Sequence, residues 1–279
     1  AVNALSLARI AQLVNGRLHD VDGDFPVDGV ATDTRKLDTA AAHAQLFVAL
    51  TGANFDGHDH VPRAAELGVR AALVARPLDV ALPQIVVADT QVALGLLAGA
   101  VQRIRDTRVI GITGSNGKTS VKQMVVAILS RHAPTVFNPG NLNNEIGLPL
   151  SILDADGDAR FAVYEMGAGQ PGDIAYLTAI ARPHIALVNN VAPAHMERMG
   201  SLLGIADTKA AIYDALPPDG TAVINADDAF APYFAQRAHG RRLLRFALDA
   251  SADITARDVV GNAGGSRFRL VTPAGEADV

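Results

Sequence analysis

The chain has 279 residues, of which 49% are hydrophobic, and a formal net charge of −5. This length suffices for two domains of ordinary size, and no apolar run reaches the roughly 20 residues that a membrane span requires. The lack of cysteine excludes disulfides and thiolate metal sites, and the scattered basic residues give no electrostatic footprint for nucleic acid. We therefore expect a cytoplasmic protein without membrane insertion or a nucleic-acid partner.

The amino-terminal part of the sequence mixes short apolar runs with helical patterns. The polar stretch at residues 103–108 marks a domain boundary. We expect a small mixed α/β domain over residues 1–107 and a second domain over residues 108–279. The elements expected in the first domain are helices at residues 5–14 and 90–104 and strands at residues 46–50 and 71–74.

In the second domain, apolar runs alternate with helical patterns, which indicates an α/β fold with a doubly wound, mostly parallel sheet. Near the end, Gly264 and Gly265 separate two extended segments, which predicts a terminal antiparallel hairpin. The expected strands are residues 109–113, 135–137, 161–165, 185–188 and 222–224, and the expected hairpin is residues 253–259 and 266–271.

A glycine-rich loop joins the strand at residues 109–113 to a helix, in the arrangement of a P-loop. Gly114 and Gly117 allow backbone N–H groups to turn toward phosphate oxygens at the helix N-terminus. Lys118 would reach the β and γ phosphates of ATP, and the Thr119 hydroxyl would bind Mg²⁺. The loop is a shortened variant, because Ile112 stands where the strict motif has glycine.

The alternative to nucleotide binding is a structural glycine-rich turn that Asn116 caps. The following helix reads as amphipathic, with an apolar set of Val121, Met124, Val125, Ile128 and Leu129. The residues expected to bind nucleotide here are Gly114, Ser115, Asn116, Gly117, Lys118, Thr119 and Ser120.

Two candidate metal ligands follow strands whose carboxyl ends share one edge of the sheet. Glu165 ends the strand at residues 161–165, and His195 lies in the loop after residues 185–188. Ligands of doubly wound sheets bind at that edge, so the two side chains and Thr119 favour a magnesium site. The alternatives are a solvated carboxylate and a hydrogen-bonded structural histidine.

An asparagine cluster at residues 138–145 also follows a strand at this edge. Such clusters usually form turns, but Asn141, Asn143 and Asn144 could equally orient phosphates or a substrate carboxylate. Both readings stay open.

Lys209 lies on the apolar stripe of a helix at residues 201–216, four residues after Ile205 and four before Tyr213. In one reading its stem is buried and its ammonium reaches water. In the other, a dry site lowers its pKa, so that the amine reacts with carbon dioxide and the carbamate supplies a metal-binding carboxylate.

Residues 109–227 resemble the Mur ligase family, whose TGxxGKT signature stands at residues 113–119. Residues 140–147 and 189–195 look like the branch that adds D-alanyl-D-alanine. Residues 32–35 and 47–58 resemble its UDP-sugar-binding domain.

This resemblance implies an ATP- and Mg²⁺-dependent ligase, expected to be a monomer, that joins UDP-N-acetylmuramoyl-tripeptide to D-alanyl-D-alanine through an acyl phosphate. It implies that Glu165 and His195 bind magnesium, that Lys209 is carbamylated, and that Asn225 and Asp227 lie near the adenine or ribose. The alternatives are another Mur ligase, folylpolyglutamate synthase, or a nucleotide-binding fragment that is inactive without a further carboxy-terminal domain. The expected catalytic residues are Lys118, Lys209 and His195, and the expected substrate-binding residues are Thr34, Arg35, Asn54, Asn141, Asn143 and Asn144.

Overall fold

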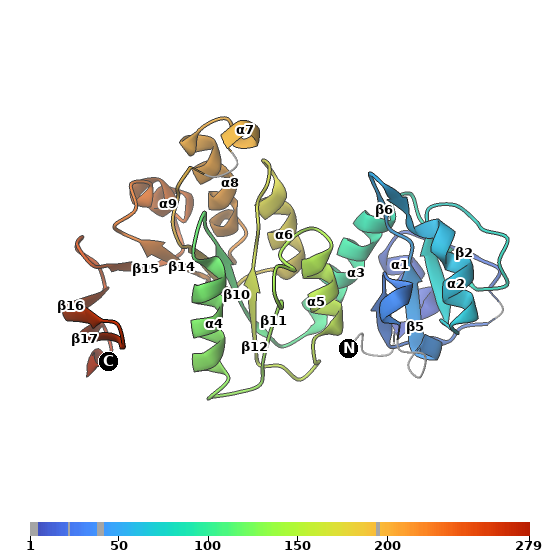
Figure 1. Ribbon diagram of the computed structural model, residues 1–279, viewed down its shortest axis with the longest axis horizontal. Coiled ribbons are helices and arrows are strands. Elements are labelled where there is room, and N and C mark those ends of the chain that lie inside the picture. Colours follow the sequence, from blue (N-terminus) through green and yellow to red (C-terminus); the bar gives the residue numbers. More distant parts are fainter. Residues whose placement is uncertain (1–4, 22, 38–41, 194–195) are drawn as a thin grey trace. The chain divides into compact units, whose positions relative to one another are not determined.

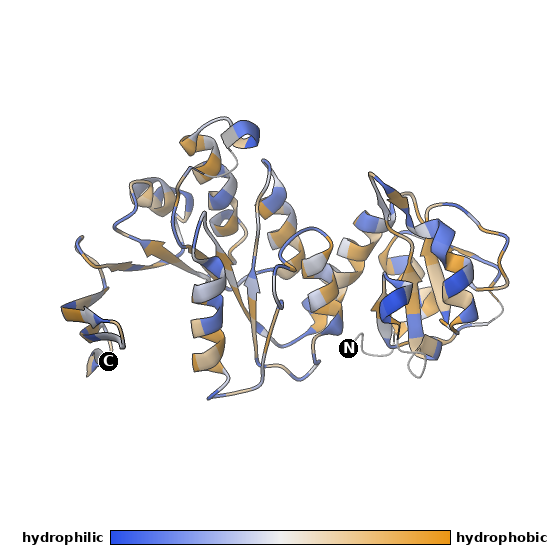
Figure 2. Ribbon diagram, in the orientation of Figure 1, coloured by the Kyte–Doolittle hydropathy of each residue, from blue (hydrophilic) through white to orange (hydrophobic). Residues whose placement is uncertain are grey.

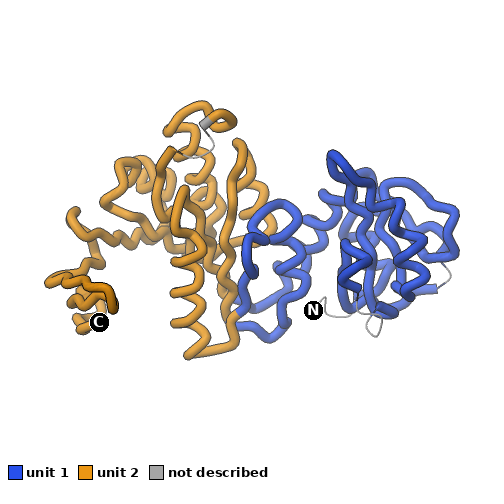
Figure 3. The backbone as a smooth tube through the Cα atoms, in the orientation of Figure 1, with its two compact units in different colours: residues 1–107, 136–160 blue, residues 108–135, 161–279 orange. Residues whose placement is uncertain are grey.

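The computed structural model describes residues 5–21, 23–37, 42–193 and 196–279, and the chain divides into two compact units (Figures 1 and 3). Unit 1 comprises residues 1–107 and 136–160, and unit 2 comprises residues 108–135 and 161–279. The boundary between residues 107 and 108 thus falls within the polar stretch at residues 103–108, as expected. Residues 136–160, however, cluster with unit 1, which the sequence did not suggest.

Unit 1 is built on a five-stranded sheet in the order β2-β9-β8-β5-β4. Strands β4, β5, β8 and β9 are parallel, and β2 is antiparallel to β9, which gives the expected mixed sheet. Phe47 and Val74 belong to its buried core. The strands are β2 (Arg17–His19), β4 (Gly29–Ala31), β5 (Gln45–Val48), β8 (Ala71–Val74) and β9 (Gln84–Val86).

Four helices and two small strand pairs complete unit 1. The helices are α1 (Leu7–Leu13), α2 (Val61–Glu66), α3 (Thr90–Ile104) and α5 (Gly147–Asp154). The pairs are β1 (Leu5–Ser6) with β3 (Pro26–Val27), and β6 (Thr51–Gly52) with β7 (Phe55–Asp56). Short 3-10 turns occupy Thr34–Lys36, Ala42–Ala44 and Gly57–His60.

Long-range hydrogen bonds explain why residues 136–160 belong to unit 1. The Arg105 guanidinium donates to the carbonyl oxygens of Ile152 (2.7 Å) and Ala155 (2.8 Å). The Thr107 hydroxyl donates to the Ala159 carbonyl at 2.8 Å. These bonds tie the chain after α3 to α5 and its exit.

Unit 2 contains strands in the order β12-β10-β13-β14-β15-β16-β17-β18. The strands from β12 to β16 are parallel, and β16, β17 and β18 are antiparallel. The strands are β10 (Arg108–Thr113), β12 (Phe161–Glu165), β13 (Ile185–Val188), β14 (Thr221–Asn225), β15 (Arg242–Ala247), β16 (Ile254–Asn262), β17 (Gly265–Thr272) and β18 (Gly275–Asp278), while β11 (Thr135–Phe137) crosses the boundary between the units.

This arrangement confirms the predicted α/β fold with a mostly parallel sheet and an antiparallel end. The helix expected at residues 5–14 is shorter, because Leu5–Ser6 form β1 and α1 begins at Leu7. The terminal hairpin also differs from the expectation. The hairpin turn lies one residue earlier, because Gly265 already begins β17, and a third antiparallel strand, β18, extends the hairpin.

The helices of unit 2 carry hydrophobic residues at helical spacing, and the mixture of hydrophobic and hydrophilic residues along each helix is visible in Figure 2. The Tyr213 hydroxyl fixes α8 to the sheet by donating to the Val223 carbonyl (2.8 Å) and accepting from the Val188 N–H (3.0 Å). The helices are α4 (Lys118–Leu129), α6 (Asp173–Ala181), α7 (Met196–Met199), α8 (Leu202–Asp214) and α9 (Ala231–Arg237).

No helix in the described part of the chain combines the length and hydrophobicity that crossing a bilayer demands.

Candidate active site

The glycine-rich loop lies where the sequence placed it, between β10 and α4. Gly117 has a φ of +73° and directly precedes the helix, a conformation that L side chains adopt only with strain. The first intrahelical bond runs from the Val121 N–H to the Gly117 carbonyl, so the amides of Lys118, Thr119 and Ser120 have no acceptor within α4. Together with the helix dipole, these amides make a site suited to an anion.

The Lys118 side chain folds back over this loop. Its ammonium donates to the Gly114 carbonyl at 2.9 Å. The contact keeps the positive charge beside the amides of the helix N-terminus.

Glu165 is buried at the end of β12, directly beside the first turn of α4. Its Oε2 accepts a hydrogen bond from the Thr119 hydroxyl at 2.8 Å, and the Lys122 Nζ lies 3.4 Å from the same oxygen. The side chains of Glu165 and Lys122 are 3% and 2% exposed, so this is a buried ion pair. The solvated-carboxylate reading of Glu165 is therefore wrong.

Lys122 is a site residue that the sequence analysis missed. The sequence analysis assigned Met124 and Ile128 to the apolar set of α4, but each is 59% exposed. The hydrophobic residues of α4 that pack against the core are Val121, Val125, Val126 and Leu129. The sequence does contain one indication of its role: Lys122 follows Thr119 by three residues and so lies on the same face of the helix.

The donor set around Glu165 fits magnesium. Within the described residues, no three His, Cys, Asp or Glu side chains gather as a metal site. Mg²⁺ is typically held by one or two carboxylates together with substrate phosphates and water. The Thr119 hydroxyl and the Glu165 carboxylate, in mutual contact beside a phosphate-binding loop, match that chemistry. His195 lies outside the described residues.

Lys209 is buried in α8, with 4% of its surface exposed, so little of the residue contacts water. Burial, with a smaller contribution from the positive charge of Lys118, lowers the pKa of Lys209 to about 8. The predicted apolar stripe thus carries a lysine whose amine is roughly one tenth neutral at pH 7.

Ser115 and Asn116 contact the segment that follows β13. The Ser115 N–H donates to the Asn190 carbonyl at 3.0 Å, and the Asn116 N–H donates to the Asn190 Oδ1 at 2.9 Å. The backbone N–H groups of these two loop residues therefore already have hydrogen-bond acceptors within the protein.

Asn225 is the last residue of β14, and Asp227 follows that strand; both bind neighbouring loops. The Asn225 amide donates to the Asn189 carbonyl at 3.0 Å. The Asp227 carboxylate accepts from the N–H groups of Leu248 (2.6 Å) and Ala250 (2.7 Å), and these bonds lower the pKa of Asp227. Asp227 thus stabilises the turn between β15 and β16. Its role in binding adenine or ribose stays a prediction.

The candidate sugar-binding residues lie in unit 1. Thr34 and Arg35 belong to a 3-10 turn, and the Arg35 guanidinium binds both oxygens of Asp33, at 2.9 and 2.8 Å. This pairing lowers the pKa of Asp33 to about 2. The Arg35 side chain is 87% exposed, and Asn54 is exposed in the turn between β6 and β7.

The asparagine cluster also belongs to unit 1. The Asn144 Oδ1 accepts from the Gly147 N–H at 2.8 Å, at the start of α5. The Asn143 N–H donates to the Asn141 carbonyl at 2.8 Å. These contacts agree with the turn reading, and the substrate-orienting reading stays a prediction.

Residues 112–279 match the family described as Mur ligase middle domain. The chain belongs to the Mur ligase family. This confirms the resemblance drawn from the TGxxGKT signature.

This Mur ligase family chain is similar to bacterial ligases. It is 42% identical over 277 residues to the UDP-N-acetylmuramoyl-tripeptide--D-alanyl-D-alanine ligase of Escherichia coli (strain K12), an alignment that covers 99% of this chain and 60% of the relative. The chain thus spans about 60% of the length of that relative.

Two solved structures share the fold over most of the chain. MurF from Acinetobacter baumannii matches with a TM-score of 0.91 and 34% identity, over 97% of this chain and 59% of that one. MurF ligase from Thermotoga maritima, solved in complex with ADP, matches with a TM-score of 0.81 and 30% identity, over 91% of this chain and 58% of that one.

Proposed function

We propose that this chain forms the nucleotide- and UDP-sugar-binding part of an ATP-dependent ligase that joins UDP-N-acetylmuramoyl-tripeptide to D-alanyl-D-alanine. The observation that carries the proposal is the phosphate loop with its partly buried Thr119–Glu165 contact and the nearby Lys118. The names of the relatives and the ADP complex of the Thermotoga maritima protein support the substrates.

In this proposal, the phosphates of ATP bind at the N-terminus of α4. The amides of Lys118, Thr119 and Ser120 donate to phosphate oxygens, and the Lys118 ammonium exchanges the Gly114 carbonyl for the β and γ phosphates. Thr119 and Glu165 would hold Mg²⁺, with His195 as a further proposed ligand. When bound, the metal would neutralise negative charge on the phosphate oxygens.

The reaction then proceeds in two steps. A carboxylate oxygen of the tripeptide attacks the γ-phosphorus, the bond from that phosphorus to the ADP oxygen breaks, and an acyl phosphate forms. The amine of D-alanyl-D-alanine next attacks the acyl carbon, phosphate leaves, and the amine loses a proton. Lys118 contributes by holding positive charge where the transferring phosphoryl group gathers negative charge, since phosphoryl transfer depends mainly on positioning and electrostatics.

The buried environment of Lys209 supports the proposed carbamate. A neutral Lys209 amine can add to carbon dioxide and lose a proton, which gives a carbamate in a region that already holds the charge of Lys118. The carbamate would add a metal-binding carboxylate to the hydroxyl of Thr119 and the carboxylate of Glu165.

A second candidate function is nucleotide binding without ligation. The observation that favours it is the location of the phosphate loop, α4 and Glu165 within unit 2, so nucleotide contacts need no residue outside that unit. In both cases the chain binds ATP and ADP at the same loop.

Nucleotide binding is tested by Lys118→Ala. We expect the affinity for ADP in the presence of Mg²⁺, measured by isothermal titration calorimetry, to fall about 10- to 100-fold, because charge-assisted hydrogen bonds to phosphate are lost. Arg131→Ala is the control, since it removes an exposed positive charge just beyond the end of α4. Equal ADP affinities of Lys118→Ala and the unchanged chain would sink the assignment of the loop.

A further inference from the structure

We infer that residues 189–192, the segment directly after β13, act as a brace that holds the phosphate loop in its nucleotide-binding form before nucleotide arrives. Asn190 is the central positioning residue of this brace. The inference rests on the proposed function, because it assigns a role in nucleotide affinity to residues outside the glycine-rich loop.

The side chain of Asn190 forms hydrogen bonds with both the backbone N–H and the backbone carbonyl of Asn116. Its Oδ1 accepts from the Asn116 N–H at 2.9 Å, and its Nδ2 donates to the Asn116 carbonyl at 3.2 Å. The Asn189 Nδ2 donates to the same carbonyl at 2.8 Å. The tip of the phosphate loop is thus held by two neighbouring amide side chains.

Ser115 is held in a similar way. Its N–H donates to the Asn190 carbonyl at 3.0 Å. Its hydroxyl donates to the Ala192 carbonyl at 3.0 Å and accepts from the Ala192 N–H at 2.9 Å. Ser115 and Asn116 are thus both hydrogen-bonded to the brace.

The brace also explains the two glycines of the loop. A Cβ at Gly114 would lie 3.0 Å from the Asn189 Cβ and 3.3 Å from the Asn190 nitrogen, and a Cβ at Gly117 would lie 2.9 Å from the Asn189 Nδ2. The brace therefore crowds both positions, and their positive φ angles independently favour glycine.

The far side of the brace is anchored to the sheet. The Asn189 N–H donates to the Thr113 carbonyl at 2.8 Å, and the Val191 N–H donates to the Asp228 Oδ2 at 2.7 Å. The Asn225 amide donates to the Asn189 carbonyl. The brace therefore connects the phosphate loop to residues 225–228, at the end of β14 and just after it.

These bonds decide which amides receive phosphate. The N–H groups of Ser115 and Asn116 already have protein acceptors, so the amides at the start of α4 and the Lys118 ammonium are left for the nucleotide. Ordering the loop in advance removes part of the entropy cost of binding. Loss of the brace should then weaken nucleotide binding more than it weakens the fold.

The test compares Asn190→Ala with a matched asparagine variant, Asn262→Ala. The Asn262 Oδ1 accepts from the Gly264 N–H at 2.7 Å in the turn between β16 and β17, so its loss removes the same kind of bond elsewhere in unit 2. We expect the Kd for ADP with Mg²⁺ to rise about tenfold in Asn190→Ala and to stay unchanged in Asn262→Ala. Hydrogen exchange in the nucleotide-free chain should be faster over residues 114–117 in Asn190→Ala alone.

Unchanged ADP affinity or unchanged exchange in a folded Asn190→Ala variant would overturn the brace. If that variant does not fold, Ser115→Ala and Ser115→Thr replace it. The alanine should weaken ADP binding and the threonine, which keeps the hydroxyl, should restore it, whereas equal affinities would overturn the brace. If the unchanged chain binds no ADP, the proposed function fails, and the exchange measurement still tests the brace separately.

Discussion

Lys209 and Glu165 are buried charged side chains with opposite surroundings. Glu165 has a hydroxyl donor in Thr119 and a cationic partner in Lys122. Lys209 is desolvated and feels the like charge of Lys118, which lowers its pKa to about 8. The two buried groups thus differ in their partners: Glu165 has an oppositely charged neighbour, whereas Lys209 has a neighbour of like charge that raises its neutral fraction.

The lowered pKa of Lys209 makes carbamate formation depend on pH. With a pKa of about 8, roughly a tenth of the amine is neutral at pH 7 and roughly nine-tenths at pH 9. Because only the neutral amine adds carbon dioxide and a proton is released, the carbamate should increase as pH rises through that range. We expect ¹³C NMR with labelled bicarbonate to show a carbamate signal that grows between pH 7 and pH 9.

Two variants identify the source of that signal. Lys209→Met should abolish it, and Lys36→Met, which removes an exposed lysine of unit 1, should leave it intact. A signal of equal size in Lys209→Met, or none in the unchanged chain at pH 9, would exclude a carbamate at Lys209.

At the scale of residues, helical spacing predicted Lys209 on a buried stripe but did not predict Lys122. The reason is that α4 begins at a polar site, so its inward face starts with Thr119 and Lys122 and becomes apolar only further along. Hydrophobic periodicity finds apolar faces and does not register a charged residue that is buried by a specific partner.

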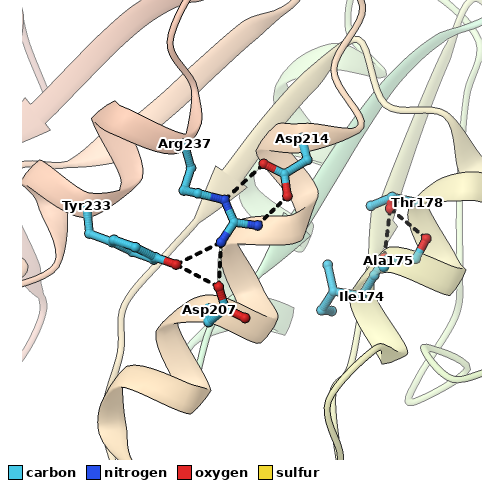
Figure 4. Close-up of polar contacts among 7 residues, drawn as sticks. All are labelled: Ile174, Ala175, Thr178, Asp207, Asp214, Tyr233 and Arg237. Carbon is cyan, nitrogen blue, oxygen red and sulfur yellow. Dashed lines mark hydrogen bonds and ion pairs between the residues drawn. The ribbon is translucent and has the colours of Figure 1, made fainter.

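At the scale of elements, an ion-pair cluster joins α8 to α9 (Figure 4). The Arg237 guanidinium on α9 binds the carboxylates of Asp207 and Asp214 on α8, and Tyr233 donates to Asp207 at 2.6 Å. The pairing raises the pKa of Arg237. Because α8 also carries Lys209, this cluster helps to position the helix of the candidate site.

We expect Arg237→Ala to lower the stability of unit 2 only modestly. Partly exposed ion pairs contribute little individually, so the loss should be about 1 kcal/mol, or roughly 3 °C in Tm by differential scanning calorimetry. Arg242→Ala, an exposed arginine on β15 outside the cluster, should leave Tm unchanged. Equal Tm values for both variants and the unchanged chain would show that the cluster adds nothing to stability.

The elements themselves were largely predictable, because their hydrophobic patterns are local. The expected bounds of α3, β11, β12 and β13 coincide with those of the structure. The placement of residues 136–160 in unit 1 was not predictable, since it depends on bonds such as that from Arg105 to the Ile152 carbonyl, 47 residues along the chain. Such contacts leave no periodic signal in either segment.

At the scale of the whole molecule, the chain carries a phosphate loop, a candidate magnesium pair and a brace, all within unit 2. The candidate sugar-binding residues lie in unit 1. These features are the candidates for nucleotide and UDP-sugar binding. The alignment covers 60% of the Escherichia coli relative, and we propose that the remaining part of that relative contributes to dipeptide binding there.

This division predicts that the chain binds ADP but shows little or no ADP release that depends on D-alanyl-D-alanine. A coupled assay should be run with ATP, Mg²⁺ and UDP-N-acetylmuramoyl-tripeptide, with and without the dipeptide, and the full-length Escherichia coli relative should serve as the positive control. We expect the dipeptide to stimulate ADP release by the control and to leave release by this chain unchanged. Robust stimulation of this chain would mean that its two units suffice for ligation, and would place dipeptide binding within the residues described here.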